Sequence, residues 1–377
     1  MSETGLVAVF TGVRRPFELR EFPVPAPEPG DIVVKIRLAN VCGSDLHAWR
    51  GEYDISRGQA EPFCLSIGHE MAGEVASLGD GVTCDTAGQP LNVGDRIVYQ
   101  YFCPCGSCKA CRRNKTPRCE VGMRYRFPPT EHPHFNAAYG QYFYVRSGQA
   151  VFKIPDNVPD DLAGPANCAL SQVIDGLERG RVGIGDTLVI QGAGGLGINA
   201  VAVARERGVS QIIVIDGIES RLELASEFGA DETILISEFP TPDSRIKRVK
   251  ELTQGEGADA VLELVGIGSV VPEGLEMLSS GGDYLMIGNI TQKQRSEIKP
   301  ADLVHGGKTL HGLMWYLPES LQQALTLLST RADRYPFHKI LSHHFPLSAI
   351  NDAFAEQDCG KVQRAARGDE ARRGAAA

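Results

Sequence analysis

Short apolar runs rich in β-branched residues, separated by glycine and proline, characterise the first 155 residues of the chain. Residues 32–38 and 74–78 are two of these runs. Short apolar runs bounded by turn-forming residues are typical of antiparallel strands. The pattern therefore predicts an antiparallel, barrel-like domain in the first part of the chain.

A different pattern begins near residue 180, where apolar runs alternate with segments of helical length. In chain order the segments are an apolar run at 187–190, a glycine-rich turn at 192–197, a helical segment at 199–207, and apolar runs at 212–216, 260–265 and 284–287. Strand, turn, helix and strand in this order form a βαβ unit, and repeated units form a doubly wound parallel sheet. The predicted fold class is α/β, with a Rossmann-type parallel sheet domain in addition to the barrel.

These patterns predict where the chain divides. Residues 1–169 are expected to form the barrel domain, residues 170–310 the nucleotide-binding domain, and residues 311–365 a return segment that completes the barrel domain. Residues 366–377 are rich in alanine, arginine and glycine and hold no bulky apolar residue. This composition predicts a disordered tail.

Composition and charge narrow the class of protein. The chain is 42% hydrophobic and has a formal net charge of −9. It lacks the apolar run of about 18 residues that a membrane span needs, so a soluble protein without a membrane partner is expected. The acidic excess disfavours nucleic-acid binding, which depends on clustered lysine and arginine. The first residues show no secretory signal, so a cytoplasmic protein is predicted.

Half of the ten cysteines lie within residues 103–119. Cys105, Cys108, Cys111 and Cys119 are separated by 3, 3 and 8 positions, so one loop can surround a single ion with four thiolates. Tetrahedral zinc suits such a set, with an iron–sulfur cluster as the alternative occupant. Because four thiolates leave no open position, this lobe at about 103–120 is predicted to be structural. Cys103 stands outside the set.

A second group of metal-binding residue types lies earlier in the chain. Cys42 and His69 are suitable zinc ligands, and Asp45 and Glu70 are carboxylates suited to orient an imidazole or a bound water. A single cysteine or histidine is more often structural. The combination is what indicates a second metal site.

The glycine-rich turn matches G-x-G-x-x-G between a predicted strand and helix. Its residues are Gly192, Gly194, Gly195, Leu196 and Gly197, with Ala193 between the first two glycines. In this context the backbone approaches a pyrophosphate at the helix N-terminus.

Residues at the ends of later strands add to the predicted dinucleotide site. Asp216 lies 22 residues after Gly194, where its carboxylate would accept the ribose hydroxyls and repel a 2′-phosphate, which favours NAD over NADP. Arg221 is expected against the adenine or ribose, or in solvent. Val265 and Ile287 are expected near the nicotinamide, or in the apolar core.

The motifs, taken in order, resemble one family. Residues 42–47, residues 68–70, the 3-3-8 cysteine set and the glycine motif resemble those of the zinc-containing medium-chain dehydrogenases, the superfamily of alcohol, sorbitol and threonine dehydrogenases. The resemblance extends from about residue 5 to 360. It implies a GroES-like barrel as the catalytic domain and a catalytic zinc held by Cys42 and His69.

The resemblance implies a third zinc ligand just before the nucleotide-binding domain. Some relatives carry Glu-Pro where this chain has Gly164-Pro165, so glutamate is absent there. Cys168 resembles the cysteine that alcohol dehydrogenases supply. The predicted ligands are Cys42, His69 and Cys168, with substrate in the fourth position and Glu70 as a ligand when that position is vacant. A plain buried thiol is the alternative for Cys168.

The implied activity is a zinc-dependent alcohol dehydrogenase that transfers hydride between NAD(H) and an alcohol, aldehyde or ketone, with two zinc ions per chain. Ser44 would hydrogen-bond the substrate oxygen, and His47 would carry its proton towards solvent. Family members are commonly dimers or tetramers, so a homodimer or homotetramer is expected. The alternative function is a non-catalytic NAD-binding protein that keeps the fold, although Cys42, Ser44 and Glu70 are all present.

The substrate is not evident from the sequence. Residues in the variable loops are candidates to contact it: Trp49, Tyr53, Arg124, Tyr125 and Arg126. Residues 85–91 and 166–170 resemble a branch of bacterial zinc-binding alcohol dehydrogenases. A small anionic alcohol or aldehyde, anchored by arginine, is one expectation.

Overall fold

The computed structural model describes residues 3–56, 60–120, 122, 128–359 and 365–368. The chain forms two compact units. Unit 1 consists of residues 1–171, 316–332 and 337–377, and unit 2 of residues 172–315 and 333–336.

Unit 2 is built on a parallel sheet. Its elements are most of α3 (Ala169–Arg179), which begins in unit 1, and β9 (Thr187–Gln191), α4 (Gly195–Glu206), β10 (Gln211–Asp216), α5 (Glu219–Glu227), β11 (Glu232–Leu235), α6 (Pro242–Leu252), β12 (Ala258–Glu263), α7 (Val270–Met277), β13 (Leu278–Met286), α8 (Pro300–Gly306) and β14 (Thr309–Gly312). The strand order is β11-β10-β9-β12-β13-β14, and all neighbouring strands are parallel. The predicted doubly wound α/β domain is confirmed.

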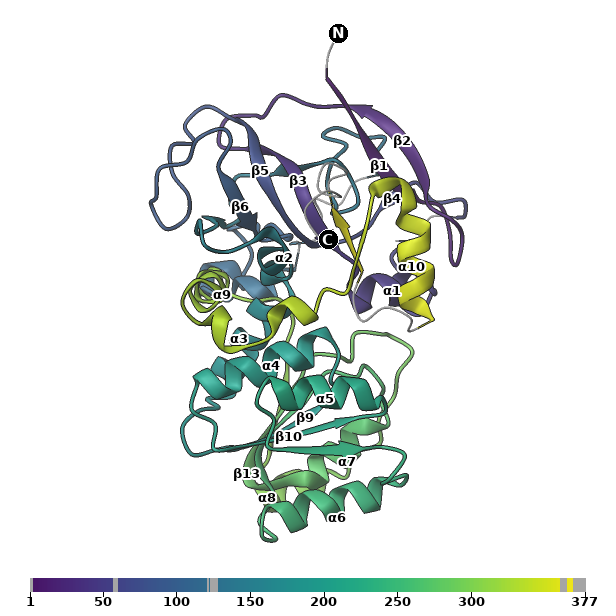
Figure 1. Cartoon of the computed structure of the whole chain (residues 1–377), viewed down its shortest axis with the longest axis vertical. Helices are drawn as coiled ribbons and strands as arrows, with labels where there is room; N and C mark the ends of the chain where they lie inside the picture. Colours follow the sequence, from purple (N-terminus) through teal and green to yellow (C-terminus); the bar gives the residue numbers. More distant parts are fainter. Residues whose placement is uncertain (1–2, 57–59, 121, 123–127, 360–364, 369–377) are drawn as a thin grey trace. The chain divides into compact units, whose positions relative to one another are not determined.

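The helices of unit 2 cover both faces of this sheet. Helices α4 and α5 lie on one face, and α6, α7 and α8 lie on the other (Figure 1). The central strand β9 is almost entirely buried, as a strand covered on both faces must be. Its carboxyl end, where the glycine motif follows, is therefore fixed by packing on both sides.

Unit 1 contains mostly antiparallel strands. Its elements before unit 2 are β1 (Thr4–Phe10), β2 (Glu18–Pro23), β3 (Ile32–Asn40), α1 (Gly43–Trp49), β4 (Leu65–Ser66), β5 (Glu70–Leu78), β6 (Arg96–Tyr99), η1 (Cys111–Arg113), η2 (Thr116–Arg118), β7 (Tyr142–Val145), β8 (Val151–Lys153), α2 (Asp160–Ala163) and η3 (Gly164–Asn167). The chain returns with α9 (Pro318–Arg331), η4 (Ala332–Arg334), η5 (Phe337–Lys339), β15 (His343–Phe345), η6 (Leu347–Ala349), α10 (Ile350–Asp358) and β16 (Ala365–Gly368).

The strands of unit 1 form two sheets. The larger has the order β15-β16-β3-β5-β6-β8, with β7 also paired to β3, and the smaller has the order β2-β1-β4. Strands β3 and β5 are antiparallel, and Asn40 at the end of β3 pairs with Glu70 at the start of β5. Because the two strands meet at these residues, the segments that follow β3 and precede β5 lie at the same edge of the sheet.

The prediction of a disordered tail from residue 366 is wrong for residues 366–368. These residues belong to β16, which pairs antiparallel with β3, and Ala365 and Ala366 are fully buried. The absence of bulky apolar side chains misled the prediction, because β16 is held by backbone hydrogen bonds between β15 and β3, and its small side chains bury easily against the sheet. Residues 369–377 lie outside the described residues.

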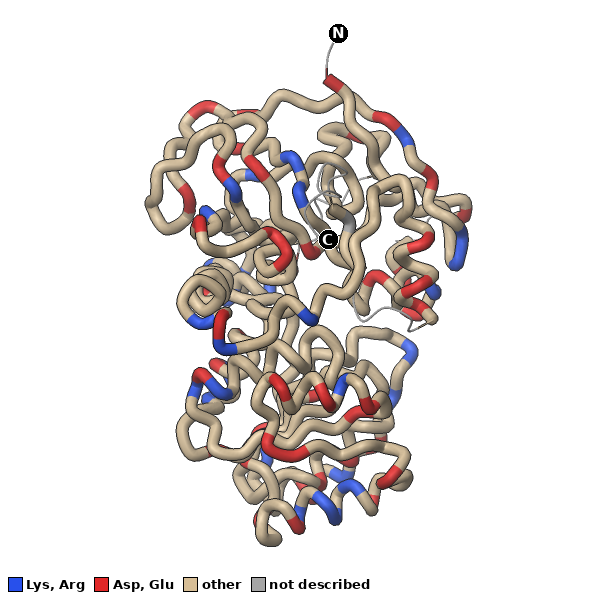
Figure 2. Tube along the Cα trace, in the orientation of Figure 1, with Lys and Arg blue, Asp and Glu red and all other residues tan. Residues whose placement is uncertain are grey.

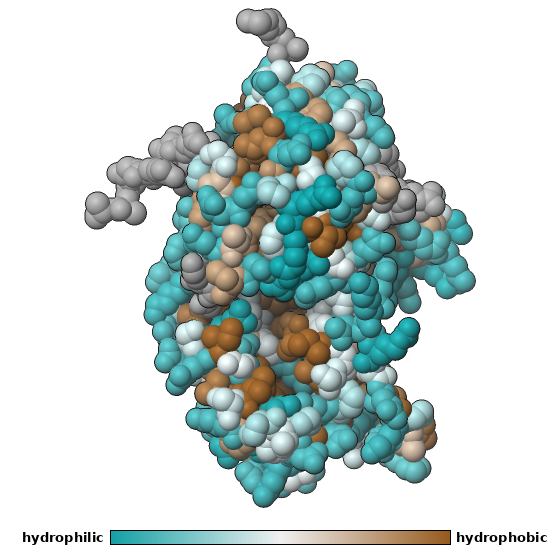
Figure 3. All heavy atoms as spheres, turned by 90° about the vertical axis from the view of Figure 1, so that its right-hand side faces the viewer, coloured by the Kyte–Doolittle hydropathy of each residue, from teal (hydrophilic) through white to brown (hydrophobic). Residues whose placement is uncertain are grey.

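The surface of each unit is mixed in character. Acidic and basic residues are intermixed along α6 (Figure 2), and the face drawn in Figure 3 is largely polar with separate apolar patches. Exposed large apolar side chains in the described chain include Val93, Ile184 and Val304. No helix in the described part of the chain is both long and apolar enough to cross a bilayer.

Candidate active site and metal centres

Four metal-binding side chains converge at the edge where β3 ends and β5 begins. One donor atom each from Cys42, His69, Glu70 and Cys168 lies within 4.8 Å of all the others. All four residues are buried, with exposed fractions of 6% or less. The structure thus brings together the three predicted ligands and the carboxylate predicted as an occasional fourth.

Local folding places Cys42 and His69. Cys42 is the N-terminal capping residue of α1, and its backbone N–H donates to Asp45 Oδ2 at 3.1 Å. Gly68 precedes His69 with φ of 97°, and a Cβ there would lie 2.9 Å from the Tyr139 ring. Glycine is therefore needed immediately before His69, both for its backbone angle and for space.

Asp45 holds the imidazole of His69. Asp45 Oδ1 lies 3.1 Å from His69 Nδ1, and Asp45 Oδ2 also accepts the Tyr139 hydroxyl at 2.8 Å. This arrangement directs Nε2 away from Asp45 and towards the other donors. Burial lowers the pKa of His69, but the negative charges of Asp45 and Cys42 outweigh burial and raise it to about 10. A metal ion at Nε2 would have to displace this proton.

Ser44 and His47 lie one turn apart on α1. Ser44 Oγ is 3.4 Å from His69 Nε2, so the hydroxyl faces the centre of the donor cluster. His47 Nδ1 pairs with Glu52 Oε2 at 2.5 Å, and the His47 side chain is 25% exposed. The two side chains therefore span the distance from the donor cluster towards solvent.

Tyr101 is a neighbour of the site that the sequence analysis did not identify. Its ring lies 4.8 Å from the His69 ring, centroid to centroid, with the planes tilted by 57°. Of the candidate substrate residues, the Trp49 indole N–H donates to the Arg15 carbonyl at 3.1 Å, and Trp49 and Tyr53 are partly exposed. Arg124, Tyr125 and Arg126 lie outside the described residues.

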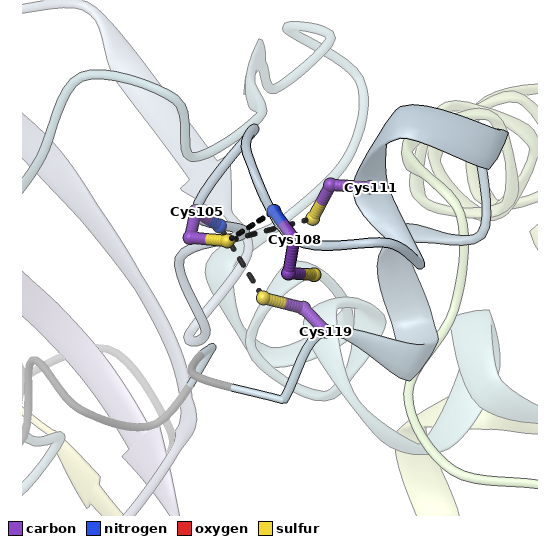
Figure 4. Close-up of side chains that lie close together, drawn as sticks. All are labelled: Cys105, Cys108, Cys111 and Cys119. Atoms are coloured by element: carbon purple, nitrogen blue, oxygen red, sulfur yellow. Dashed lines mark hydrogen bonds between the residues drawn. The ribbon is translucent and has the colours of Figure 1, made fainter.

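The cysteine lobe forms a second donor cluster. The thiols of Cys105, Cys108, Cys111 and Cys119 point towards one another (Figure 4) and lie within 4.8 Å of each other. The backbone N–H groups of Cys105 and Cys108 donate to the sulfurs of Cys119 and Cys105, each at 3.3 Å. Amide donors stabilise the negatively charged thiolate form of cysteine. A group of such thiolates is suited to bind a cation.

The sulfur atoms of this lobe differ in their surroundings. Hydrogen bonds from the Cys108 and Ser107 backbone lower the pKa of Cys105 to about 6. Cys103 is not one of the four, since its thiol contacts the Ser147 carbonyl at 3.7 Å and burial raises its pKa to about 11. Its placement agrees with the expectation that Cys103 stands outside the set.

The two donor sets fit zinc by their chemistry. Four thiolates form a closed tetrahedral set, typical of structural zinc. Two thiolates and one imidazole, with a carboxylate at hand, form the open set typical of catalytic zinc. The first set is partly exposed and lies in a loop, whereas the second is buried at the junction of β3, β5 and η3.

In unit 2, the glycine motif occupies the turn between β9 and α4. Gly192 has φ of 100°, and a Cβ on Gly197 would lie 2.0 Å from the Gly192 carbonyl oxygen. Gly194 is the N-terminal capping residue of α4, followed by Gly195 and Leu196 in its first turn. The residues from Gly194 to Leu196 are partly exposed, which leaves the helix N-terminus open to a phosphate.

Asp216 lies at the end of β10, next to this turn. Its Oδ2 accepts the Ala193 N–H at 2.7 Å, and its Oδ1 accepts the Ile218 N–H at 2.9 Å. Arg221 is close, with its Nη1 3.9 Å from Asp216 Oδ2. Each carboxylate oxygen has a further lone pair, so the fixed carboxylate retains capacity to accept a hydroxyl.

Glu263 is an anchor that the sequence analysis missed. This fully buried carboxylate ends β12, and its Oε1 accepts the N–H groups of Val265 and Gly266 at 2.8 and 2.7 Å. Its Oε2 accepts the Asn289 N–H at 3.1 Å. Ile287 is buried, and its N–H donates to the Glu263 carbonyl at 3.1 Å. One side chain therefore ties together the loops that follow β12 and β13.

Comparisons with known proteins identify the family. Residues 28–156 match the alcohol dehydrogenase GroES-like domain, and residues 195–330 match the zinc-binding dehydrogenase model. The 5-exo-hydroxycamphor dehydrogenase of Pseudomonas putida is 33% identical over 338 residues, which cover 89% of this chain and 91% of that protein. An L-threonine 3-dehydrogenase of Francisella tularensis is 29% identical over 91% of this chain and 94% of its own length.

Solved structures agree with this assignment. An alcohol dehydrogenase from Thermotoga maritima has a TM-score of 0.88 with 28% identity, covering 98% of this chain and all of its own. The alcohol dehydrogenase of Thermus sp. ATN1 has a TM-score of 0.83 with 29% identity, covering 96% of this chain and 99% of its own. The predicted GroES-like domain is confirmed, and nothing in these comparisons favours the non-catalytic alternative. The chain therefore belongs to the zinc-binding dehydrogenase family and is a zinc-dependent oxidoreductase.

Proposed function

We propose that the protein is an NAD-preferring alcohol dehydrogenase that carries two zinc ions per chain, one catalytic and one structural. The observation that carries this proposal is the buried donor cluster of Cys42, His69, Glu70 and Cys168. Its Cys₂His set with an additional carboxylate is suited to a zinc ion that keeps a position for substrate. The four-cysteine lobe would hold the second ion.

The chain's own residues would bind the substrate oxygen and move its proton. When bound, zinc would supply Lewis acidity to the oxygen of the alcohol or carbonyl, and the nicotinamide cofactor would supply hydride chemistry. The Ser44 hydroxyl lies 3.4 Å from His69 Nε2 and would hydrogen-bond that oxygen. His47, one turn further along α1 and paired with Glu52, would pass the proton to solvent.

The preference for NAD rests on Asp216. A carboxylate at the end of β10 would accept ribose hydroxyls and would repel the additional phosphate of NADP. The Ala193 and Ile218 N–H groups fix both of its oxygens, so the carboxylate is held beside the glycine turn. The neighbouring Arg221 would lie against the adenosine.

For substrate, we favour an alcohol whose hydroxyl is attached to an apolar body. The Tyr101 ring beside His69 supplies an aromatic wall near the donor cluster. A relative of 33% identity is a 5-exo-hydroxycamphor dehydrogenase, named for a bulky apolar alcohol. A small anionic alcohol is the second class to be included in the substrate panel.

The proposal predicts turnover by zinc-replete protein, followed by absorbance of the reduced nicotinamide with NAD and separately with NADP. The panel would contain cyclic secondary, aromatic primary, polyol and anionic alcohols. Cys42→Ala should abolish activity, whereas Cys64→Ala, a change at a cysteine outside both donor clusters, should not. Metal analysis should give about two zinc ions per chain. Turnover that survives in Cys42→Ala would refute the catalytic role of this cluster.

We also propose that the protein works as a homodimer or homotetramer in the cytoplasm, without nucleic-acid or membrane partners. Strand β14 is one of the two edge strands of the parallel sheet, and its residues Thr309 and Gly312 are exposed. An exposed strand edge is suited to pair with a second copy. Light scattering at several concentrations would measure the oligomeric state, and a monomer throughout would contradict this part of the proposal.

A further inference from the structure

Asn167 lies directly before Cys168 and is fully buried at the end of η3. Its side-chain amide makes three hydrogen bonds to backbone groups of two other segments. Nδ2 donates to the carbonyl oxygens of His69 and Tyr99, each at 3.1 Å, and Oδ1 accepts the Met71 N–H at 3.3 Å. One residue thus connects the segment that carries Cys168 with the segment that carries His69 and Glu70.

These hydrogen bonds take the place of β-sheet hydrogen bonds at the start of β5, where β6 no longer pairs with it. Strand β6 ends at Tyr99, and its pairing with β5 covers only residues 72–74 of β5. The His69 carbonyl and the Met71 N–H precede that paired stretch and face the same edge of β5, because alternate residues of a strand direct their backbone groups alike. The Asn167 amide carries a carbonyl and an N–H group like a peptide bond. It therefore extends the ladder past the end of β6.

The backbone of Asn167 is held from a different direction. The Tyr316 hydroxyl donates to the Asn167 carbonyl, and Gln100 Nε2 donates to the Tyr316 carbonyl at 3.2 Å. Tyr316 is fully buried, and burial raises its pKa well above the usual value, so the hydroxyl remains a donor. Both the side chain and the main chain of Asn167 are fixed, which leaves Cys168 little freedom at the next position.

We propose that Asn167 is a positioning residue for the catalytic zinc, and that it sets the distance between the Cys168 sulfur and the His69 imidazole. The inference rests on the proposed zinc ligation by Cys42, His69 and Cys168. Asn167 bonds residues 69 and 71 on either side of Glu70 and directly precedes Cys168 in the chain. A shift of Asn167 would therefore move three of the four donors relative to one another. A zinc site tolerates only small departures from its ligand distances.

Two substitutions separate the contributions of the amide. Asn167→Ala removes all three side-chain hydrogen bonds. Asn167→Asp keeps an acceptor for the Met71 N–H but places a carboxylate oxygen against the His69 and Tyr99 carbonyls, which repel it. The matched control is Asn351→Ala, because Asn351 also bonds backbone groups of unit 1, with Oδ1 accepting the Phe17 N–H at 2.7 Å and Nδ2 donating to the Phe17 carbonyl at 3.2 Å.

The experiment measures zinc retention against a graded chelator, together with the absorption spectrum of cobalt(II)-substituted protein. Cys42→Ala removes a ligand from the buried cluster, and Cys111→Ser removes one from the lobe. The zinc ion and the thiolate-to-cobalt absorption band that each variant loses therefore belong to the cluster that was changed. Both Asn167 variants are expected to hold the Cys42-cluster zinc about 10- to 100-fold more weakly, the usual effect of removing a residue that orients metal ligands. Their lobe zinc should be held as in the parent, and Asn351→Ala should retain both ions.

Three other outcomes would contradict the inference, each for a different reason. Unchanged retention and an unchanged cobalt spectrum in both Asn167 variants would show that Asn167 is structural only. Equal loss of both zinc ions would show general unfolding instead of a specific effect. If the parent protein itself binds only the lobe zinc, the proposed two-zinc assignment fails, and the inference fails with it because there is no catalytic zinc to position.

Discussion

Asp45 illustrates how one buried carboxylate can determine the geometry of a proposed zinc ligand, His69. It accepts hydrogen bonds from the Cys42 N–H and the Tyr139 hydroxyl while it pairs with His69 Nδ1. All three partners lie in or beside the donor cluster. The side chain therefore fixes both the orientation of the imidazole and the start of α1.

We predict that Asp45→Asn lowers kcat/KM by about 10- to 100-fold, because an amide nitrogen would face one of these donors and the imidazole would lose its negative partner. Steady-state kinetics with zinc analysis would measure the effect. Asp85→Asn is the control, since Asp85 is also buried and accepts three backbone N–H groups, at Ala87, Gln89 and Lys153. An equal loss in both variants would attribute the effect to folding.

We predict that Asp216 determines the preference for NAD over NADP. Asp216→Ser removes the charge that would bind the ribose, and charged hydrogen bonds contribute about 1.5–3 kcal/mol. The KM for NAD should rise about 10- to 100-fold, while the KM for NADP should change less. Asp231→Ser is the control, because Asp231 Oδ2 accepts the Ile212 N–H at 2.7 Å on the same sheet. An unchanged ratio of the two cofactors would contradict the proposed role.

The predicted site residues belong to recognisable sequence patterns, whereas Asn167 and Glu263, which were not predicted, do not. Cys42, His69 and the glycine motif occur in recognisable sequence patterns, as expected for residues that would act together on one ion or one phosphate group. Asn167 bonds backbone groups of residues 69, 71 and 99, and Glu263 bonds the backbone of Asn289 as well as that of its own loop. Such partners depend on which strands end beside one another, and no spacing in the sequence reports that.

Among the elements of unit 2, the loops that follow the neighbouring strands β12 and β13 are joined by hydrogen bonds to one side chain. Glu263 at the end of β12 accepts N–H groups from the loop after β12 and from the loop after β13. A Cβ on Gly288 would lie 2.6 Å from the Leu264 carbonyl carbon, so the two loops are in close contact. They should move together when either is displaced.

We predict that Glu263→Gln destabilises unit 2 by about 1–3 kcal/mol, because an amide nitrogen would face at least one buried N–H group. It should also weaken NADH binding by about tenfold, equivalent to about 1.4 kcal/mol. Unfolding curves and fluorescence titration with NADH would measure both effects. Asp259→Ala, at the other end of β12, removes the acceptor for the Thr187 N–H and should affect stability only. Unaltered NADH binding in Glu263→Gln would refute the anchoring role.

Elements that follow a regular pattern were predictable, whereas β16 was not. The runs at 187–190 and 212–216 fall within β9 and β10 because a strand covered on both faces must be apolar. Strand β16 consists of two alanines, an arginine and a glycine. Its position depends on the open edge of β3, with which it pairs, and that edge exists only in the folded barrel.

For the whole molecule, the two donor clusters differ in what they are expected to stabilise. The Cys42 cluster is assembled from segments that the sheet of unit 1 already positions, at the ends of β3 and β5 and after η3. The lobe from Cys105 to Cys119 has only the short η1 and η2 as regular structure. A zinc ion should therefore contribute much of the lobe's folding free energy, but less of that of the Cys42 cluster.

Comparison of Cys111→Ser with Cys42→Ala tests this difference. Each variant should bind one zinc per chain instead of two. Cys111→Ser should lower the thermal midpoint by more, with a loss of stability well above the ~1 kcal/mol of an ordinary substitution. Cys42→Ala should abolish turnover and leave the midpoint closer to that of the parent. Calorimetry, metal analysis and a steady-state assay on both variants would measure this. The opposite order of midpoints would mean that the buried cluster, not the lobe, depends on its metal to fold.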